Sequence, residues 1–159
     1  MYVEAIGVLA GQSELNAGDC FFFDDRGRTI FAICTKEGEG RHKAAVVFSR
    51  EGGDRLPWIA TGGLPHTVLR TQILQIRTDP SSLAFGNSLP LGHVIVAGGA
   101  FYIAAAFRKI DTVTINLSTG ITEELPLTGV FVSFSRWSAG IVDGDRWIPV
   151  FNFPLPENH

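Results

Sequence analysis

The sequence is poor in cysteine and in charged residues, and both shortages limit what the protein can be. It contains two cysteines, Cys20 and Cys34, in 159 residues, too few for the disulfide framework of a small secreted domain. Lysine and arginine number 13 against 16 aspartates and glutamates, giving a net charge of −3. An acidic chain lacks the basic surface that phosphate backbones require, so we exclude nucleic acid as a main partner.

We expect neither a targeting segment nor a membrane-spanning segment in this sequence, with a secreted form that has lost its leader as the alternative. The first residues, MYVEAIGVLAG, carry Glu4 within their apolar run and have no basic residue before it, so they do not resemble a secretory leader. The unbroken apolar run Val94–Phe107 is shorter than the roughly 20 residues that a transmembrane helix needs. We therefore expect a cytoplasmic protein with no membrane partner and with both thiols reduced.

No local motif for catalysis or metal binding is present. The four histidines and two cysteines show no C-x₂-C or H-x₃-H spacing. The glycine pairs Gly62-Gly63 and Gly98-Gly99 match no phosphate-binding loop, and Ser138 lacks the first glycine of a nucleophile elbow. We predict no catalytic residue and no metal site, and the sequence favours a protein that is not an enzyme.

The sequence is instead rich in short apolar runs separated by turn residues. It is 45% hydrophobic, with 18 glycines and 12 phenylalanines, a composition typical of all-β proteins. We expect a single all-β domain over residues 1–159 with little or no helix, an antiparallel meander that closes into a barrel or a two-sheet sandwich. The expected strands are Val3–Leu9, Cys20–Phe23, Thr29–Thr35, Lys43–Ser49, Leu56–Thr61, Val94–Ala97, Ala100–Phe107, Thr112–Leu117, Thr122–Leu125, Val130–Trp137, Ile141–Val142 and Arg146–Phe153.

Two stretches are harder to assign. Pro65–Arg77 fits a helical face as well as a strand alternation, and its β-branched content favours the strand. Thr78–Leu91 contains two prolines, three serines and a Gly-Asn pair, which predict a linker or long loop.

The strongest structural prediction is a hairpin at the centre of the sheet. Gly98-Gly99 supplies the positive φ angles of a two-residue turn between Val94–Ala97 and Ala100–Phe107. This register pairs Ala97 with Ala100 and Val94 with Ile103. Since side chains alternate between the faces of a sheet, both faces of the hairpin are apolar and both should be covered.

The hairpin at Cys20–Lys36 resembles this central one, and two β-hairpin repeats are therefore an open alternative within the single domain. Aligning Cys20–Lys36 with His93–Lys109 places turn on turn, and the repeats would span residues 15–61 and 89–137. Any two antiparallel meanders share hydrophobic alternation, so the similarity also has a simpler explanation.

His93 and Tyr102 form the only candidate ligand site that we name. The predicted register places them diagonally on one face of the central hairpin, with Ala104 and Ala106 beside them leaving room. A histidine and a tyrosine in an apolar recess could orient a small molecule or transfer a proton. The alternative is a satisfied, partly buried histidine whose alanine neighbours admit a packed sheet.

Residues Arg28–Gly62 carry a resemblance to a known family. Ala32-Ile33-Cys34-Thr35, Gly40-Arg41-His42, Val46-Val47-Phe48 and Leu56–Thr61 follow one another in this segment. In this order they resemble the strand–turn–strand segment of FMN-binding split-barrel proteins related to pyridoxamine phosphate oxidase. Lys43 and Ala44 replace the family's usual pattern after the histidine, and Pro57 interrupts the last strand. The resemblance implies FMN as an alternative cofactor, whereas the residues themselves imply none.

Two functions follow as alternatives. The favoured one is a non-enzymatic β module that binds a partner or assembles with itself, and the other is a small-ligand-binding β-barrel. A mean hydropathy of +0.19 with 18% charged residues suggests too little polar surface for a lone domain, so we expect a homo-oligomer, by default a dimer. Trp137, Trp147, Phe151 and Phe153 could pack on a neighbouring copy or fill the core of the monomer.

Overall fold

The computed structural model describes residues 7–36, 43–50, 56–71, 74–125 and 130–157. Within these ranges the fold is all-β, as predicted: the strands form two sheets, and no α-helix is present beside short 3-10 segments such as η1 (Gln12–Glu14) and η3 (Pro80–Ser82). The first residues of the expected strand Val3–Leu9 and the segment Gly40-Arg41-His42 of the family resemblance lie outside the described residues.

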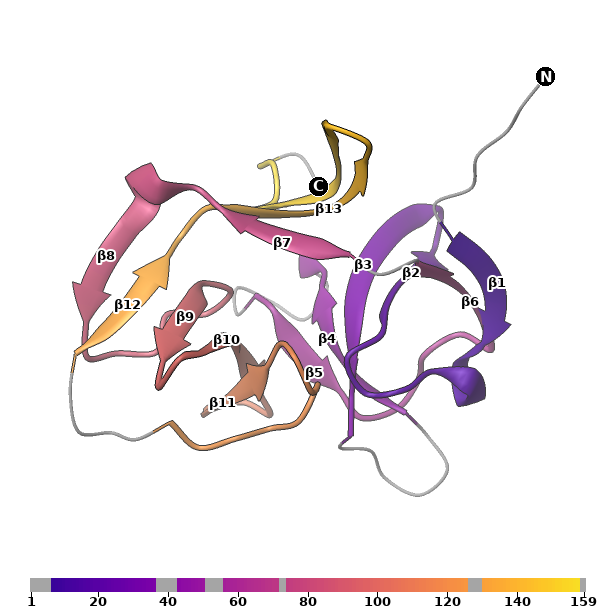
Figure 1. The fold of residues 1–159 in the computed structure, drawn as a ribbon. Coiled ribbons are helices and arrows are strands. Elements are labelled where there is room, and N and C mark those ends of the chain that lie inside the picture. The colour runs from indigo at the N-terminus through magenta and orange to yellow at the C-terminus, as the bar shows by residue number, and fades with distance from the viewer. Residues whose placement is uncertain (1–6, 37–42, 51–55, 72–73, 126–129, 158–159) are drawn as a thin grey trace.

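The larger sheet has eleven strands and the smaller has three. In order of pairing, the larger sheet contains β1 (Gly7–Gly11), β6 (Thr67–Thr71), β2 (Cys20–Asp25), β3 (Arg28–Thr35), β4 (Ala44–Phe48), β5 (Trp58–Ala60), β10 (Ala100–Phe107), β9 (Val94–Ala97), β12 (Phe131–Phe134) and β8 (Leu83–Gly86), with β11 (Asp111–Asn116) paired to β10. The smaller sheet contains β14 (Arg146–Phe153), β13 (Trp137–Asp143) and β7 (Gln75–Thr78). In Figure 1 the N-terminal strands curl into a rounded arch, and the smaller sheet lies across the top.

The larger sheet does not close into a barrel over the described part of the chain. Its terminal strands, β1 and β8, each pair with one neighbour and lie at opposite ends of the strand order. Figure 1 shows them on opposite sides of the molecule. Two partly superposed sheets, rather than one closed sheet, therefore build the core.

The central hairpin forms with the predicted register. Ala97 pairs with Ala100 and Val94 with Ile103, and Gly98 and Gly99 have φ angles of 56° and 78°. Val94 and Ile103 enter one hydrophobic cluster while Tyr102 enters another, so both faces are covered at this level. The tip of the hairpin differs from the prediction, because Phe101 is 49% exposed.

The main core lies between the two sheets and is aromatic. Phe151 of β14 stacks on Phe31 of β3 with ring centroids 4.4 Å apart, and Trp137 of β13 stacks on Phe153 at 5.7 Å. Phe48 of β4 contacts all four of these rings. Three of the four C-terminal aromatics that we considered for a subunit interface thus fill the core of the monomer, because the smaller sheet folds back over the larger one.

A second core fills the inside of the N-terminal arch. Its buried members come from strands β2 to β6, from the loop before β2 and from the loop between β5 and β6: Leu15, Phe21, Ile30, Ala32, Cys34, Ala45, Val47, Ala60, Leu64 and Val68. The strands β3 and β4 therefore bury both faces, one in each core, which explains their uninterrupted apolar sequences.

The segment between residues 65 and 91 forms more strands than predicted. The strand interpretation of Pro65–Arg77 is confirmed by β6 and β7, which belong to different sheets. The prediction of a long loop at Thr78–Leu91 is wrong, because Leu83–Gly86 forms β8 by pairing with β12. Two other predicted strands also differ: Thr122 makes a single bridge to Ile115, and Val130–Trp137 is divided between β12 and β13.

A polar corner explains why that strand is divided. The chain changes sheets between β6 and β7, between β7 and β8 and between β12 and β13. The last two of these passages meet at Asp79, Ser82 and Arg136. The Arg136 guanidinium binds the Asp79 carboxylate at 2.9 Å, and the Arg136 N–H donates to the Ser82 hydroxyl at 3.0 Å. Hydrogen bonds from Ser81 and Arg136 lower the pKa of Asp79 to about 2, so this corner keeps its charge pair at neutral pH.

The two hairpins considered as repeats share a turn geometry. Arg26 and Gly27 have φ angles of 52° and 82°, close to those of Gly98 and Gly99, and both pairs form two-residue turns of the kind that matches strand twist. An alignment that superposes these two turns is shifted by one residue from the sequence alignment of Cys20–Lys36 with His93–Lys109. The duplication itself stays a prediction.

The two cysteines are free, as predicted. Cys20 pairs with Ile33 across the β2–β3 hairpin, so it points to the opposite face from Cys34, and no disulfide can join them. Burial, with Asp19 nearby, raises the pKa of Cys20 to about 12, and burial raises that of Cys34 to about 11.

These thiols should be slow to react in the folded protein. Since the thiolate is the reactive form, the raised pKa of each thiol lowers its reactivity by at least about a hundredfold relative to an ordinary thiol. A chromogenic thiol reagent at mildly alkaline pH should detect little reaction in the native protein and two thiols after unfolding, with free glutathione as the reference. Rapid labelling of the native protein, or no thiol after unfolding without reductant, would contradict this.

Candidate functional site

Tyr102, one of the two residues of the predicted ligand site, is held by a partner that the sequence did not suggest. It is 8% exposed, and its hydroxyl donates to Glu123 Oε2 at 3.0 Å. Burial raises the pKa of Tyr102, and its hydrogen bond to Glu123 and the charge of that carboxylate act in the same direction. The hydroxyl is therefore a hydrogen-bond donor, with no tendency to ionise at neutral pH.

Glu123 is the centre of a small polar cluster. Asn116 Nδ2 donates to Glu123 Oε1 at 3.1 Å, and the Thr114 hydroxyl donates to the backbone carbonyl of Glu123. These bonds fasten the segment after Gly120 over the face of β10 and β11, where Leu125 joins Tyr102 and Ile95 in a hydrophobic cluster. Both carboxylate oxygens of Glu123 thus accept hydrogen bonds from within the protein, and the Tyr102 hydroxyl has its hydrogen-bond partner without any ligand.

His93 stands apart from this cluster. It is half-buried immediately before β9, and its Nδ1 is buried without a hydrogen-bond partner in the described part of the chain. Burial lowers the pKa of His93, so the imidazole is neutral at physiological pH. No hydrogen bond joins His93 to Tyr102 within the described ranges, and a ligand site at this pair stays a prediction.

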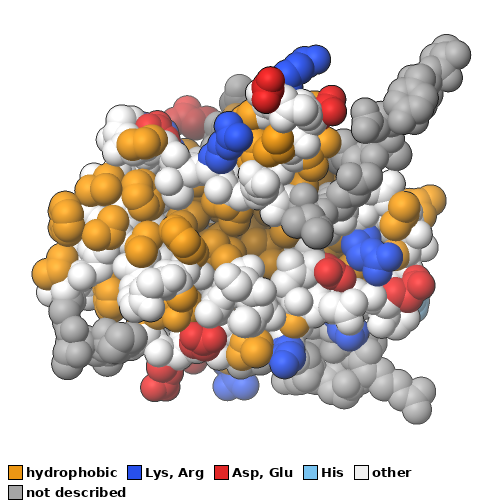
Figure 2. All heavy atoms as spheres, viewed as in Figure 1, with side chains coloured by type: hydrophobic (Ala, Val, Ile, Leu, Met, Phe, Trp, Pro, Cys, Tyr) orange, Lys and Arg blue, Asp and Glu red, His pale blue; other side chains and the backbone are white. Residues whose placement is uncertain are grey.

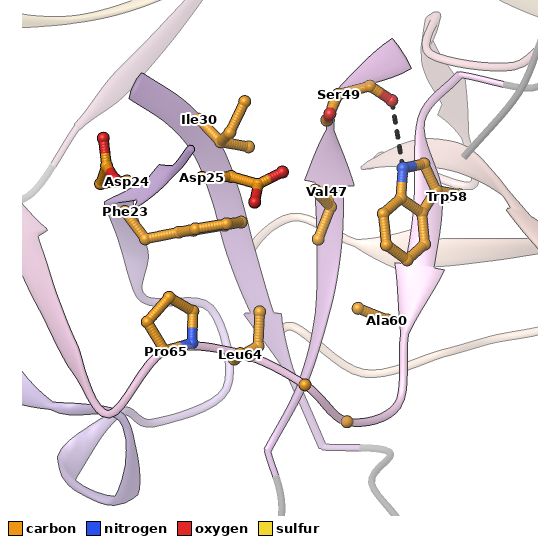
Figure 3. Close-up of a pocket in the computed structure, with 12 residues that line it drawn as sticks. Phe23, Asp24, Asp25, Ile30, Val47, Ser49, Trp58, Ala60, Leu64 and Pro65 are labelled. Atoms are coloured by element: carbon orange, nitrogen blue, oxygen red, sulfur yellow. Dashed lines mark hydrogen bonds between the residues drawn. The ribbon is translucent and has the colours of Figure 1, made fainter. Parts of the chain in front are cut away.

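A pocket at the mouth of the N-terminal arch has a different chemistry (Figure 3). Its volume is about 280 Å³. Phe23 and Asp25 extend from β2 into it, because residues two apart share a face of the strand, and Trp58 of β5 stands on the opposite side. The loop Gly62–Pro65 and buried side chains of the inner core complete it: Ile30, Val47, Ala60 and Leu64.

The pocket is shaped before any ligand arrives. The indole N–H of Trp58 donates to the backbone carbonyl of Ser49 at 3.1 Å, which fixes the ring as one wall (Figure 3). The Asp24 carboxylate points away and accepts from the Gly27 N–H at 3.3 Å. The Asp25 carboxylate points between Phe23 and Trp58. Phe23 and Asp25 lie two residues apart in β2 and so share a face of the strand, a pattern that did not mark them as a site in the sequence alone.

A second, larger cavity lies between the two sheets. Its volume is about 500 Å³, and aromatic side chains of both sheets line it together with Arg28 and Arg50. The Arg50 guanidinium donates to the backbone carbonyl of Leu155 at 3.4 Å. This cavity is continuous with the aromatic core.

An exposed apolar surface covers one end of the larger sheet. Cross-strand pairing aligns Phe85, Val132, Val96 and Phe101 in one row over β8, β12, β9 and β10. Leu83 and Phe134 extend the next row on the same face, which continues to buried Val94 and Ile103. We call the first six residues the open face. Phe85 is 72% exposed and Leu83 is 44% exposed, and Figure 2 shows apolar side chains gathered over this end.

The described residues form neither a cluster of metal ligands nor a membrane-spanning helix. No three His, Cys, Asp or Glu side chains gather there in a way that could hold a metal ion. The same part of the chain contains no helix of the length and hydropathy needed to cross a bilayer.

Comparison with known proteins gave no match: no protein-family model, no curated protein and no solved structure is significantly similar to this chain.

Proposed function

We propose that this protein is a non-enzymatic β module that assembles with a second copy of itself through the open face. The observation that carries the proposal is the continuity of this face with the main core. The row containing Leu83 and Phe134 leads directly to Val94 and Ile103, which the core buries. The smaller sheet covers only the part of this face near Val94 and Ile103. The rest, the open face, is as apolar as the core but is exposed or half-buried.

The free edge of β8 supports the same proposal. β8 is the terminal strand of the larger sheet, and all four of its residues are exposed. An unpaired edge next to an apolar face invites another strand. A two-fold axis near β8 would let the same edge and the same open face of a second copy meet antiparallel, which is the closed arrangement that most homodimers use. The two sheets would then act as the layers of an incomplete sandwich that the second copy completes.

A charge in the open face should separate the two copies. We expect the wild-type protein to sediment as a dimer at micromolar concentration and Phe85→Lys to sediment as a monomer. Phe85 is 72% exposed, so its replacement should leave the fold intact, while two lysines meeting near a two-fold axis would repel each other.

Leu9→Lys is the matched control for this experiment. Leu9 is 77% exposed on β1, the terminal strand at the other end of the same sheet. It should leave the dimer unchanged. A wild-type protein that sediments at the monomer mass of 17.2 kDa would contradict the proposal. Dissociation by Leu9→Lys and not by Phe85→Lys would contradict it as well, because the interface would then lie at β1 and not at β8.

A small-ligand-binding protein, with FMN as the cofactor suggested by the segment Arg28–Gly62, is the alternative. The same purified sample decides between them, because bound flavin has a visible absorbance spectrum and the self-assembling module has none. A cytoplasmic location accompanies the proposal, since two unpaired cysteines are compatible with a reducing compartment.

A further inference from the structure

We propose that the pocket between Phe23, Asp25 and Trp58 binds a small organic cation that carries an alkylammonium group. This site is separate from the open face, and it would give the module a ligand in addition to a partner. The charge of the pocket, its walls and its size each favour a ligand of this kind.

The described lining of the pocket carries a negative charge. The Asp25 carboxylate makes no hydrogen bond or ion pair with any residue that the structure describes, although it is half-buried. The described lining includes Asp24 and Asp25 but no lysine, arginine or histidine. A carboxylate turned into an apolar recess without a partner loses part of its hydration, and a cation entering the pocket would restore that loss.

The walls of the pocket select an organic cation over a hydrated metal ion. Trp58 and Phe23 stand on opposite sides of the Asp25 carboxylate (Figure 3), and aromatic faces attract cations, tryptophan most strongly. Ile30, Val47 and Ala60 form an apolar floor that offers methyl groups contact and offers a metal ion no ligand. An anion is excluded because it would face the carboxylates.

The size of the pocket limits the ligand to a small head group. Its volume of about 280 Å³ lies at the lower end of the range of about 300–1,000 Å³ for ligand pockets. The Ser49 carbonyl already holds the Trp58 ring in place, so binding requires no rearrangement of that wall. A trimethylammonium group fits this description, whether it belongs to a free molecule or to a methylated lysine side chain.

Choline and its neutral isostere, in which carbon replaces the nitrogen, test the proposal directly. We expect choline chloride to shift the Trp58 indole N–H resonance in a saturable way, with sodium chloride at equal concentration as the blank. The Trp58→Phe variant assigns that resonance among the three tryptophans. The isostere should bind at least about fivefold more weakly, since it keeps the shape and loses the charge.

Asp25→Asn and Asp24→Asn form a matched pair of variants. Asp25→Asn should weaken choline binding by about five- to tenfold, whereas Asp24→Asn, whose side chain points away from the pocket, should change it by less than about twofold. Comparing choline with a peptide that contains trimethyllysine separates the two sources, and tighter binding of either supports the site. Absence of a saturable shift, or equal effects of the two variants, would overturn the proposal.

Discussion

Replacing Phe151 with alanine is expected to lower the free energy of unfolding by about 3–5 kcal/mol. The Phe151 ring is 8% exposed and lies 4.4 Å from Phe31, 5.0 Å from Phe48 and 5.4 Å from Trp137, measured between ring centroids. Its removal leaves a cavity at the point where the two sheets meet. Since a domain of this kind is stable by only about 5–15 kcal/mol, one such cavity removes a large share of the total.

Denaturant unfolding followed by circular dichroism measures this effect. Phe151→Leu, which keeps most of the apolar volume, should cost less than half as much, and it remains measurable where Phe151→Ala is too unstable to purify. Ile110→Ala is the surface control, because Ile110 is 85% exposed and its truncation should change stability by less than about 0.5 kcal/mol. Equal losses for Phe151 and Ile110 would show that the aromatic core is not where the sheets are held together.

Gly120→Ala should destabilise the protein by about 3 kcal/mol. Gly120 has a φ angle of 68°, and a Cβ added there would lie 2.1 Å from the backbone nitrogen of Gly18 and 2.7 Å from the carbonyl carbon of Ala17. Neither atom can retreat freely, because the Gly18 N–H donates to the Cys34 carbonyl at 2.8 Å. A methyl group would therefore force apart two chain segments. The segment at Gly18 is hydrogen-bonded to β3, and the segment at Gly120 is hydrogen-bonded to β11.

Gly144→Ala separates this clash from the cost of the backbone conformation. Gly144 also has a positive φ, 57°, but a Cβ there meets nothing within 4 Å. It should cost about 1 kcal/mol, the penalty of a left-handed alanine alone. Thermal or denaturant unfolding of both variants gives the difference, and two equal losses would mean that the approach of Gly18 to Gly120 is easily relaxed.

Local patterns predicted the parts of the fold that depend on local chemistry. The Gly98-Gly99 turn determines its own register because two residues with positive φ permit only one kind of tight hairpin. The β-branched content of Pro65–Arg77 also identified its strands correctly.

What sequence analysis missed depends on partners that are distant in the chain. Leu83–Gly86 is too short and too close to serines and prolines to show a strand pattern, and only β12 makes it one. The C-terminal aromatics fit a core or an interface equally well until β7 and β13 place the smaller sheet over the larger one.

In the candidate sites, too, local features were predicted and partners distant in the chain were not. Tyr102 was correctly placed within the sheet, but its partner Glu123 comes from a segment that makes only one bridge to its neighbour. The Phe23–Asp25–Trp58 pocket joins β2 to β5, which are separated by two other strands, so no spacing along the chain could indicate it.

The strand order of the smaller sheet has a consequence for synthesis on the ribosome. β7 leaves the ribosome well before β13, its strand partner among the described residues, and β14 brings Phe151 and Phe153 later still. Chains elongate at about 5–20 residues per second, so for several seconds the apolar faces of β3 and β4 await a cover that has not been translated. Nascent chains halted before β13 should consequently be strong clients of chaperones that recognise exposed apolar strands, whereas those halted after β14 should be released.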